Sequence, residues 1–116
     1  MTTTDLVKAI ESWQLPCGSE AALQLALEQL FSGLGLEFTR EHVLSPIDRL
    51  DFFVAGVAVE AKIKGSLTDL MRQLHRYAQH ESVRELLVVT PAIRLSRLPR
   101  ELNGKPVSVA LLLGGL

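Results

Sequence analysis

The chain has 116 residues, 47% of them hydrophobic and 22% charged, and its formal net charge is −1. This length and composition are typical of one compact domain with a buried core, and they exclude an intrinsically disordered chain. Proteins that coat nucleic acid without specificity are clearly basic, so any surface for a polyanion must be local here.

Several simple patterns bear on the compartment. The one cysteine, Cys17, has no partner for an internal disulfide, which indicates a reducing compartment. The three histidines, His42, His75 and His80, have no metal-ligand spacing with one another or with Cys17, so we expect no zinc site. The chain has no apolar run of membrane-spanning length and no secretion-signal pattern at its start. We therefore expect a cytoplasmic protein without membrane contact.

Two amphipathic segments open the chain. Thr4 is a candidate N-cap for a helix to Trp13, and Ser19 is a candidate N-cap for a helix to Phe31. The elements predicted next are a strand over 36–44, a hairpin of strands over 51–54 and 57–64, a helix over 65–80, and strands over 86–90 and 106–113. The segment 92–102 stays open between a short helix and a loop, and Asn103-Gly104 is a turn signal.

The element order, ααβββαββ, predicts a mixed α/β (α+β) fold that spans residues 1–116 as a single domain. A three-stranded meander followed by a crossover helix and another strand gives a mixed sheet flanked by helices. The apolar run 86–90, which ends at Pro91, is typical of a buried central strand of such a sheet.

The predicted hairpin carries charges where a core strand would be apolar. If Ala55-Gly56 is a two-residue turn, counting outward pairs Asp51 with Glu60. Alternation then puts Lys62 and Lys64 on the same face as Glu60. A turn one residue longer would break this alignment, and Asp48 would then be the rival carboxylate.

Directly opposed carboxylates repel each other, with Cβ atoms roughly 4.5–5.5 Å apart. A divalent cation between Asp51 and Glu60 would turn that repulsion into coordination, and the backbone carbonyl of Ala61 would add an oxygen ligand. Phosphodiester cleavage needs such a cation, and Lys62 would orient or deprotonate the attacking water. The plain alternative is a surface ion pair between Asp51 and Lys62.

An Asp, a spacer and Glu-x-Lys on a β-hairpin, with a helix before and an αβ unit after, resemble the PD-(D/E)xK nuclease superfamily over about residues 18–90. The resemblance implies a restriction-endonuclease-like core that cleaves DNA with Mg²⁺, for which Mn²⁺ substitutes, and no organic cofactor. It makes Asp51 and Glu60 the metal ligands and Lys62 the catalytic lysine. Leu50 stands where the motif's name has proline.

Two further patterns resemble branches of the superfamily. Gln73 and Tyr77, four residues apart on the predicted helix, resemble the auxiliary Q-x-x-x-Y motif of RecB-like enzymes, which makes both candidate catalytic residues. Gly18-Ser19-Glu20 resembles the helix start of archaeal Holliday-junction resolvases, which makes Glu20 a candidate metal ligand. This second resemblance implies a structure-selective enzyme working as a dimer.

Basic residues near the motif are the candidate nucleic-acid-binding surface. Those closest to it in the sequence are Lys64, Arg72 and Arg76. Arg94, Arg97 and Arg100 join them if they share the active-site side, and are ordinary solvated charge otherwise. The apolar C-terminal stretch 111–116 is either a buried strand or a homodimer contact.

Three functional hypotheses follow. The first is a small Mg²⁺-dependent nuclease acting on DNA. The second is a catalytically inactive module with the nuclease fold that binds DNA or serves assembly. The third, with least support, is a purely structural interaction protein. Cleavage assays with and without metal separate the first two.

Overall fold

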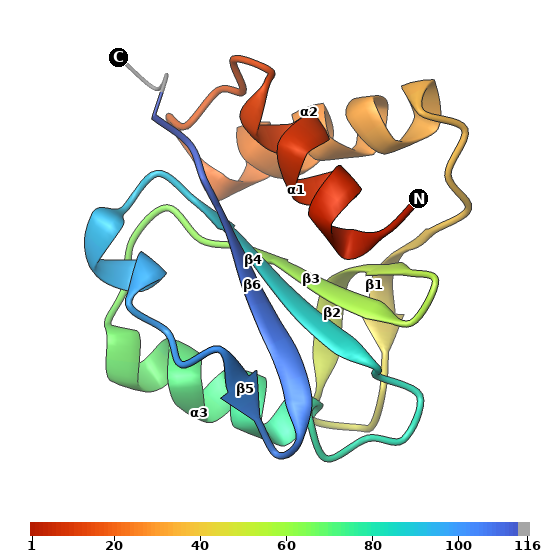
Figure 1. The fold of residues 1–116 in the computed structure, drawn as a ribbon, viewed down its shortest axis with the longest axis vertical. Helices are drawn as coiled ribbons and strands as arrows, with labels where there is room; N and C mark the ends of the chain where they lie inside the picture. The colour runs from red at the N-terminus through yellow and green to blue at the C-terminus, as the bar shows by residue number, and fades with distance from the viewer. Residues whose placement is uncertain (114–116) are drawn as a thin grey trace.

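The computed structural model describes residues 1–113, and its helices lie on both faces of one six-stranded sheet (Figure 1). In chain order the elements are α1 (Thr3–Glu11), α2 (Glu20–Gly33), β1 (Thr39–Val43), β2 (Arg49–Val54), β3 (Val57–Ala61), α3 (Leu67–Tyr77), β4 (Glu85–Thr90), a 3₁₀ turn η1 (Ile93–Ser96), β5 (Glu101–Leu102) and β6 (Lys105–Leu111).

The sheet is mixed, and its strand order is β1-β2-β3-β4-β6-β5. Strands β1, β2 and β3 form an antiparallel meander, β4 runs parallel to β3, and β6 runs parallel to β4. The crossover from β3 to β4 contains α3, because parallel neighbours need a long connection. The prediction of a mixed α/β class is confirmed, as is the central place of the apolar strand β4.

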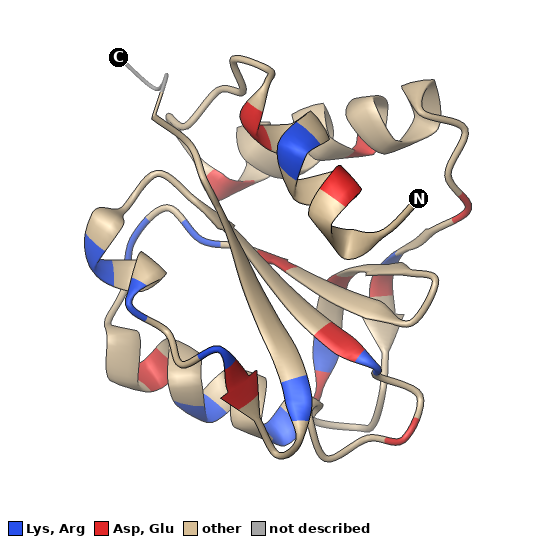
Figure 2. Ribbon diagram, viewed as in Figure 1, with Lys and Arg blue, Asp and Glu red and all other residues tan. Residues whose placement is uncertain are grey.

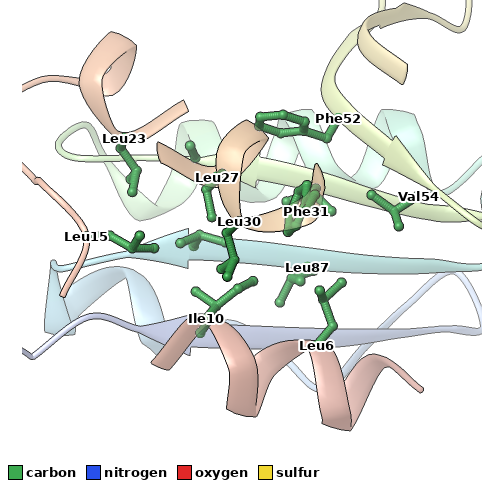
Figure 3. Close-up of a cluster of buried hydrophobic side chains, with 14 of the residues drawn as sticks. Leu6, Ile10, Leu15, Leu23, Leu27, Leu30, Phe31, Phe52, Val54 and Leu87 are labelled. Atoms are coloured by element: carbon green, nitrogen blue, oxygen red, sulfur yellow. The ribbon is translucent and has the colours of Figure 1, made fainter. Parts of the chain in front are cut away.

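Two apolar clusters hold the layers together. Helices α1 and α2 pack on one face of the sheet, with Leu27 and Phe31 of α2 against Phe52 and Leu87 of the strands (Figure 3). The rings of Phe31 and Phe52 meet edge to face with centroids 5.2 Å apart. Helix α3 packs on the opposite face, where its apolar stripe meets strand and η1 residues. That second cluster comprises Leu50, Ala58, Leu70, Leu74, Tyr77, Ala78, Val83, Leu86, Val88, Leu95 and Val107.

Side-chain caps start each helix. Ser19 caps α2 as predicted, since its Oγ accepts a hydrogen bond of 3.0 Å from the backbone N–H of Ala22. The predicted cap at Thr4 is wrong, because Thr2 forms a capping box with Asp5 and starts α1 earlier. Ser66 caps α3 through the backbone N–H of Asp69.

The predicted order ααβββαββ lacks one strand. The segment 92–102 contains η1 and then β5, whose two residues pair with the start of β6 across the predicted turn at Asn103-Gly104. Both turn residues have left-handed φ values, 51° and 78°. Two residues are too few to show an alternating pattern, so β5 has no signal in the sequence.

Several predicted boundaries are also too wide. The first strand begins at Thr39 instead of 36, the helix predicted over 65–80 is Leu67–Tyr77, and β3 ends at Ala61 instead of 64. The next backbone amide, that of Lys62, still donates to the Val89 carbonyl at 2.9 Å. Within residues 1–113, no helix has both the length and the apolar character needed to cross a membrane.

Candidate active site

The hairpin of β2 and β3 has the predicted register. Phe52 pairs with Val59, Phe53 with Ala58, and Val54 with Val57. The two turn residues, Ala55 and Gly56, both adopt left-handed φ values, of 48° and 85°. This conformation suits a two-residue hairpin turn, because its twist matches that of the flanking strands. The turn therefore fixes which residues of the two strands lie opposite each other.

Beyond the Phe52–Val59 pair, two carboxyl side chains link the strands. The backbone N–H of Asp51 donates to Glu60 Oε1 at 3.1 Å, and the backbone N–H of Ala61 donates to Asp51 Oδ2 at 2.8 Å. The structure thus brings Asp51 and Glu60 together, as the register predicts. Glu60 is only 1% exposed, whereas Asp51 is half-buried.

The electrostatics of this pair are unfavourable for two negative charges. Burial, and next the charge of Asp51, raise the pKa of Glu60 to about 8. Burial also raises the pKa of Asp51, although the hydrogen bond from Ala61 and the charge of Lys62 oppose the increase. A cation bound between the two carboxylates would relieve this cost.

The donor set suits a hard divalent cation. Two carboxylates from adjacent strands, a strand-end carbonyl and water oxygens are the ligands that Mg²⁺ prefers in proteins. Ala61 already donates its backbone N–H to Asp51, so its own carbonyl lies at the same point of β3. The role of that carbonyl as a ligand stays a prediction.

Glu20 does not join the pair. It is half-buried in the first turn of α2. Across residues 1–113 there is no group of three or more His, Cys, Asp or Glu side chains placed to hold a metal ion. Helix α2 packs on the sheet face that carries Val59 and Ala61, whereas Glu60 alternates with these residues. Direct coordination by Glu20 is therefore not a feature of this arrangement.

A cleft with a volume of about 440 Å³ is lined by Lys62, which follows Glu60 by two residues. Its basic lining residues are Lys62, Lys64, Arg72 and Arg76, and its polar lining includes Gln73. The predicted nucleic-acid-binding residues thus share one cleft with the predicted catalytic lysine. Figure 2 shows lysine and arginine along the loop after β3 and on α3.

The other arginines divide into two sets. Arg94 on η1 donates from its guanidinium to the Gly65 carbonyl at 2.9 Å, which places it at the rim of the cleft. Arg97 and Arg100 are not among the described residues that line the cleft. Arg94 is not itself among the described lining residues either, so the alternative between a phosphate-binding surface and ordinary solvated charge stays open for these arginines.

Gln73 and Tyr77 form a hydrogen-bonded pair on α3, as their four-residue spacing predicts. Gln73 Nε2 donates to the Tyr77 hydroxyl at 2.8 Å, and that hydroxyl donates to the Arg49 carbonyl at 2.9 Å. Burial, and next the charge of Glu60, raise the pKa of Tyr77, so the hydroxyl stays protonated. Tyr77 therefore fastens α3 to β2, and Gln73 extends from it into the cleft.

Asp48, the rival carboxylate, has a different environment. Its side chain is 5% exposed, and it accepts from Arg76 Nε at 3.0 Å and lies 3.1 Å from His80 Nε2. Burial alone would raise the pKa of Asp48, but the hydrogen bonds of Arg76 and His80 outweigh burial and lower it. Asp51 is therefore the aspartate beside Glu60. Sequence reasoning missed this cluster, because Asp48 lies 28 and 32 positions from Arg76 and His80 in the sequence.

No family model matches the chain, and neither a curated protein nor a solved structure shows a significant match to it.

Proposed function

We propose that the chain is a small Mg²⁺-dependent nuclease that cleaves DNA phosphodiester bonds on a restriction-endonuclease-like core. The observation that carries the proposal is the reciprocal bonding of Asp51 and Glu60, two residues before Lys62, which lines a cleft with four basic side chains. The fold supports the proposal, because a helix, an antiparallel meander, a crossover helix and a parallel strand follow one another in the order that this core requires.

The side chains of the chain divide the chemistry among them. A Mg²⁺ ion held by Asp51 and Glu60 would polarise the phosphate and activate water. Lys62 lies close enough to influence both carboxyl groups and also lines the cleft, which supports a position facing the scissile phosphate of a bound DNA strand. Its ammonium group stabilises the negative charge that develops in the transition state. Lys64, Arg72 and Arg76 bind neighbouring phosphates.

The decisive experiment compares the purified chain with two variants, Lys62→Ala and Glu60→Gln, on single-stranded, duplex and four-way-junction DNA with Mg²⁺ or Mn²⁺. We expect cleavage by the parent and a loss of at least about 100-fold in each variant, in line with the removal of one transition-state contact. Mg²⁺ should also raise the melting temperature of the parent and leave that of Glu60→Gln unchanged.

Matched controls are Lys8→Ala and Glu37→Gln, which change exposed residues of the same types outside the cleft. Both should cleave like the parent. The nuclease assignment fails if the parent cleaves none of these DNA forms with either metal, or if Lys62→Ala and Glu60→Gln cleave as well as it does.

One observation favours the inactive module as a second candidate. Both carboxyl groups already accept hydrogen bonds from backbone amides, so the pair holds β2 to β3 without a metal. DNA binding that is equally tight with and without Mg²⁺, together with no cleavage, would support this candidate.

The structure-selective, junction-resolvase-like subclass and its homodimer also remain part of the proposal. The predicted last strand extends beyond β6, and residues 114–116 of the apolar C-terminus lie outside the described residues. Leu112 is buried, whereas Leu113 is 72% exposed. Trp13, which is 62% exposed, lines the same depression as Leu113, and exposed apolar side chains that lie together support a contact between two copies.

A further inference from the structure

We propose that Asp48, assisted by His80, is a positioning residue that aims the guanidinium group of Arg76 at a phosphate of bound nucleic acid. The inference rests on the nucleic-acid-binding part of the proposed function and not on catalysis. It assigns a role to the buried carboxylate of Asp48, which the catalytic site does not use.

The carboxylate of Asp48 is fixed by its own backbone. The backbone carbonyl of Asp48 accepts hydrogen bonds from the backbone N–H groups of Leu44 and Ser45, at 2.9 and 3.3 Å. Its backbone N–H donates to Ser45 Oγ at 3.1 Å. The turn between β1 and β2 therefore places this carboxylate rigidly under the last turn of α3.

Arg76 uses only part of its guanidinium on Asp48. The hydrogen bond of 3.0 Å runs from Nε to Asp48 Oδ1, and no hydrogen bond from either Nη group is found within the described residues. The side chain is 47% exposed and lines the cleft with Lys62. Nε thus serves as an anchor, while the two Nη groups remain for a phosphate, which they can bind in a bidentate manner.

His80 completes the anchor. Its Nε2 lies 3.1 Å from the second carboxylate oxygen, so each oxygen of Asp48 has one side-chain partner. A buried carboxylate with fixed partners holds Arg76 before the ligand arrives, which reduces the conformational entropy lost on binding.

The same helix provides a contrasting pair. Arg72 also lines the cleft, but its partner Asp69 is an exposed residue three positions earlier, and the two charged groups are 3.7 Å apart. Exposed pairs of this kind contribute little to stability or to side-chain orientation. Asp69 is therefore the natural control for Asp48.

The test measures the affinity for short duplex DNA by fluorescence anisotropy, in metal-free buffer over a series of salt concentrations. The variants are Asp48→Asn, Arg76→Ala and the double variant, with Asp69→Asn as the control. Removal of a negative charge alone would tighten DNA binding. We expect the opposite for Asp48→Asn, namely weaker binding and a salt slope that falls by up to about 0.9, the value of one phosphate contact.

The double variant supplies the critical comparison. If Asp48 acts through Arg76, Asp48→Asn should cause no further loss in the Arg76→Ala background. Asp69→Asn should bind as tightly as the parent or more tightly. Arg76→Lys keeps the positive charge but loses the planar guanidinium group that Asp48 anchors, so its affinity should fall toward that of Arg76→Ala. Because Arg76 is 47% exposed, this variant should fold, and it tests the inference even if Asp48→Asn does not fold.

The inference is overturned if Asp48→Asn binds DNA as well as the parent, if its effect adds to that of Arg76→Ala, or if Arg76→Lys binds like the parent. It is equally overturned if the parent does not bind duplex DNA. A parent that binds with this coupling and does not cleave would refute the nuclease and leave the inference intact. A parent that cleaves DNA without this coupling would refute the inference and leave the nuclease assignment intact.

Discussion

The carboxyl group of Glu60 is buried beside a second carboxyl group, that of Asp51. The uncharged form of Glu60 is favoured in the fold, since burial and the charge of Asp51 raise its pKa from 4.5 to about 8. The pH dependence of the free energy of unfolding therefore reports the ionisation of Glu60 without any assay of activity.

We expect the stability of the fold to decline with rising pH. Between pH 4.5 and about 8 the folded chain binds more protons at Glu60 than the unfolded chain, so the free energy of unfolding falls as pH rises through this window. Urea unfolding at both ends of the window should show the decline in the parent and a clearly smaller one in Glu60→Gln. An equal decline in both proteins would contradict the assignment of the shift to Glu60.

The proximity of two candidate site residues could be predicted where local rules fix the geometry. The turn at Ala55-Gly56 determines the pairing of the hairpin by counting, so the proximity of Asp51 and Glu60 follows from the sequence. The cluster of Asp48, Arg76 and His80 depends on how the β1–β2 turn packs against α3. That packing joins residues 28 and 32 positions apart, which no local pattern encodes.

Helix α3 is the element that connects the site to the rest of the fold. It covers one face of the sheet, donates a hydrogen bond to β2 through Tyr77, and lines the cleft through Gln73 and Arg76. Its strongly amphipathic pattern predicts this arrangement in outline. Its length was overestimated, because the residues after Tyr77 form turns that local propensity does not separate from a helix.

Removal of the Tyr77 hydroxyl should loosen the contact between α3 and β2. Tyr77→Phe keeps the buried ring but leaves the Arg49 carbonyl without the hydroxyl that now donates to it. The expected cost is about 1–3 kcal/mol in the free energy of unfolding, measured by urea titration with an unchanged m-value. His75→Ala, at an exposed position of the same helix, is the control and should cost much less. A cost near zero for Tyr77→Phe would show that this bond does not hold the elements together.

On the scale of the whole molecule, the two faces of the sheet differ in character. The α3 face carries the basic cleft, whereas the α1–α2 face carries an open groove of about 650 Å³ with no charged residue among the residues of 1–113 that line it. Trp13 belongs to this groove and also to a neighbouring depression lined by Leu113. The proposed contact between copies therefore lies away from the cleft and leaves it open to DNA.

Sedimentation velocity over a range of protein concentrations tests the dimer. We expect a dimer in the parent and a shift to monomer in Leu113→Asp, because a charge would enter an apolar contact. Ile47→Asp is the matched control, since Ile47 is 79% exposed in the turn between β1 and β2 and should leave the dimer intact. A parent that sediments as a monomer throughout, or equal dissociation by both variants, would refute the proposed contact.

The short turn at Ala55-Gly56 also determines where this chain can change in length during evolution. An insertion there would shift the register by one residue, separate Asp51 from Glu60, and move side chains between the two faces of the sheet. The connection between α3 and β4 depends on the same turn, because the backbone N–H of Arg84 donates to the Gly56 carbonyl at 2.8 Å. We therefore expect insertions and deletions to be excluded from the hairpin as long as its two carboxyl groups have to meet.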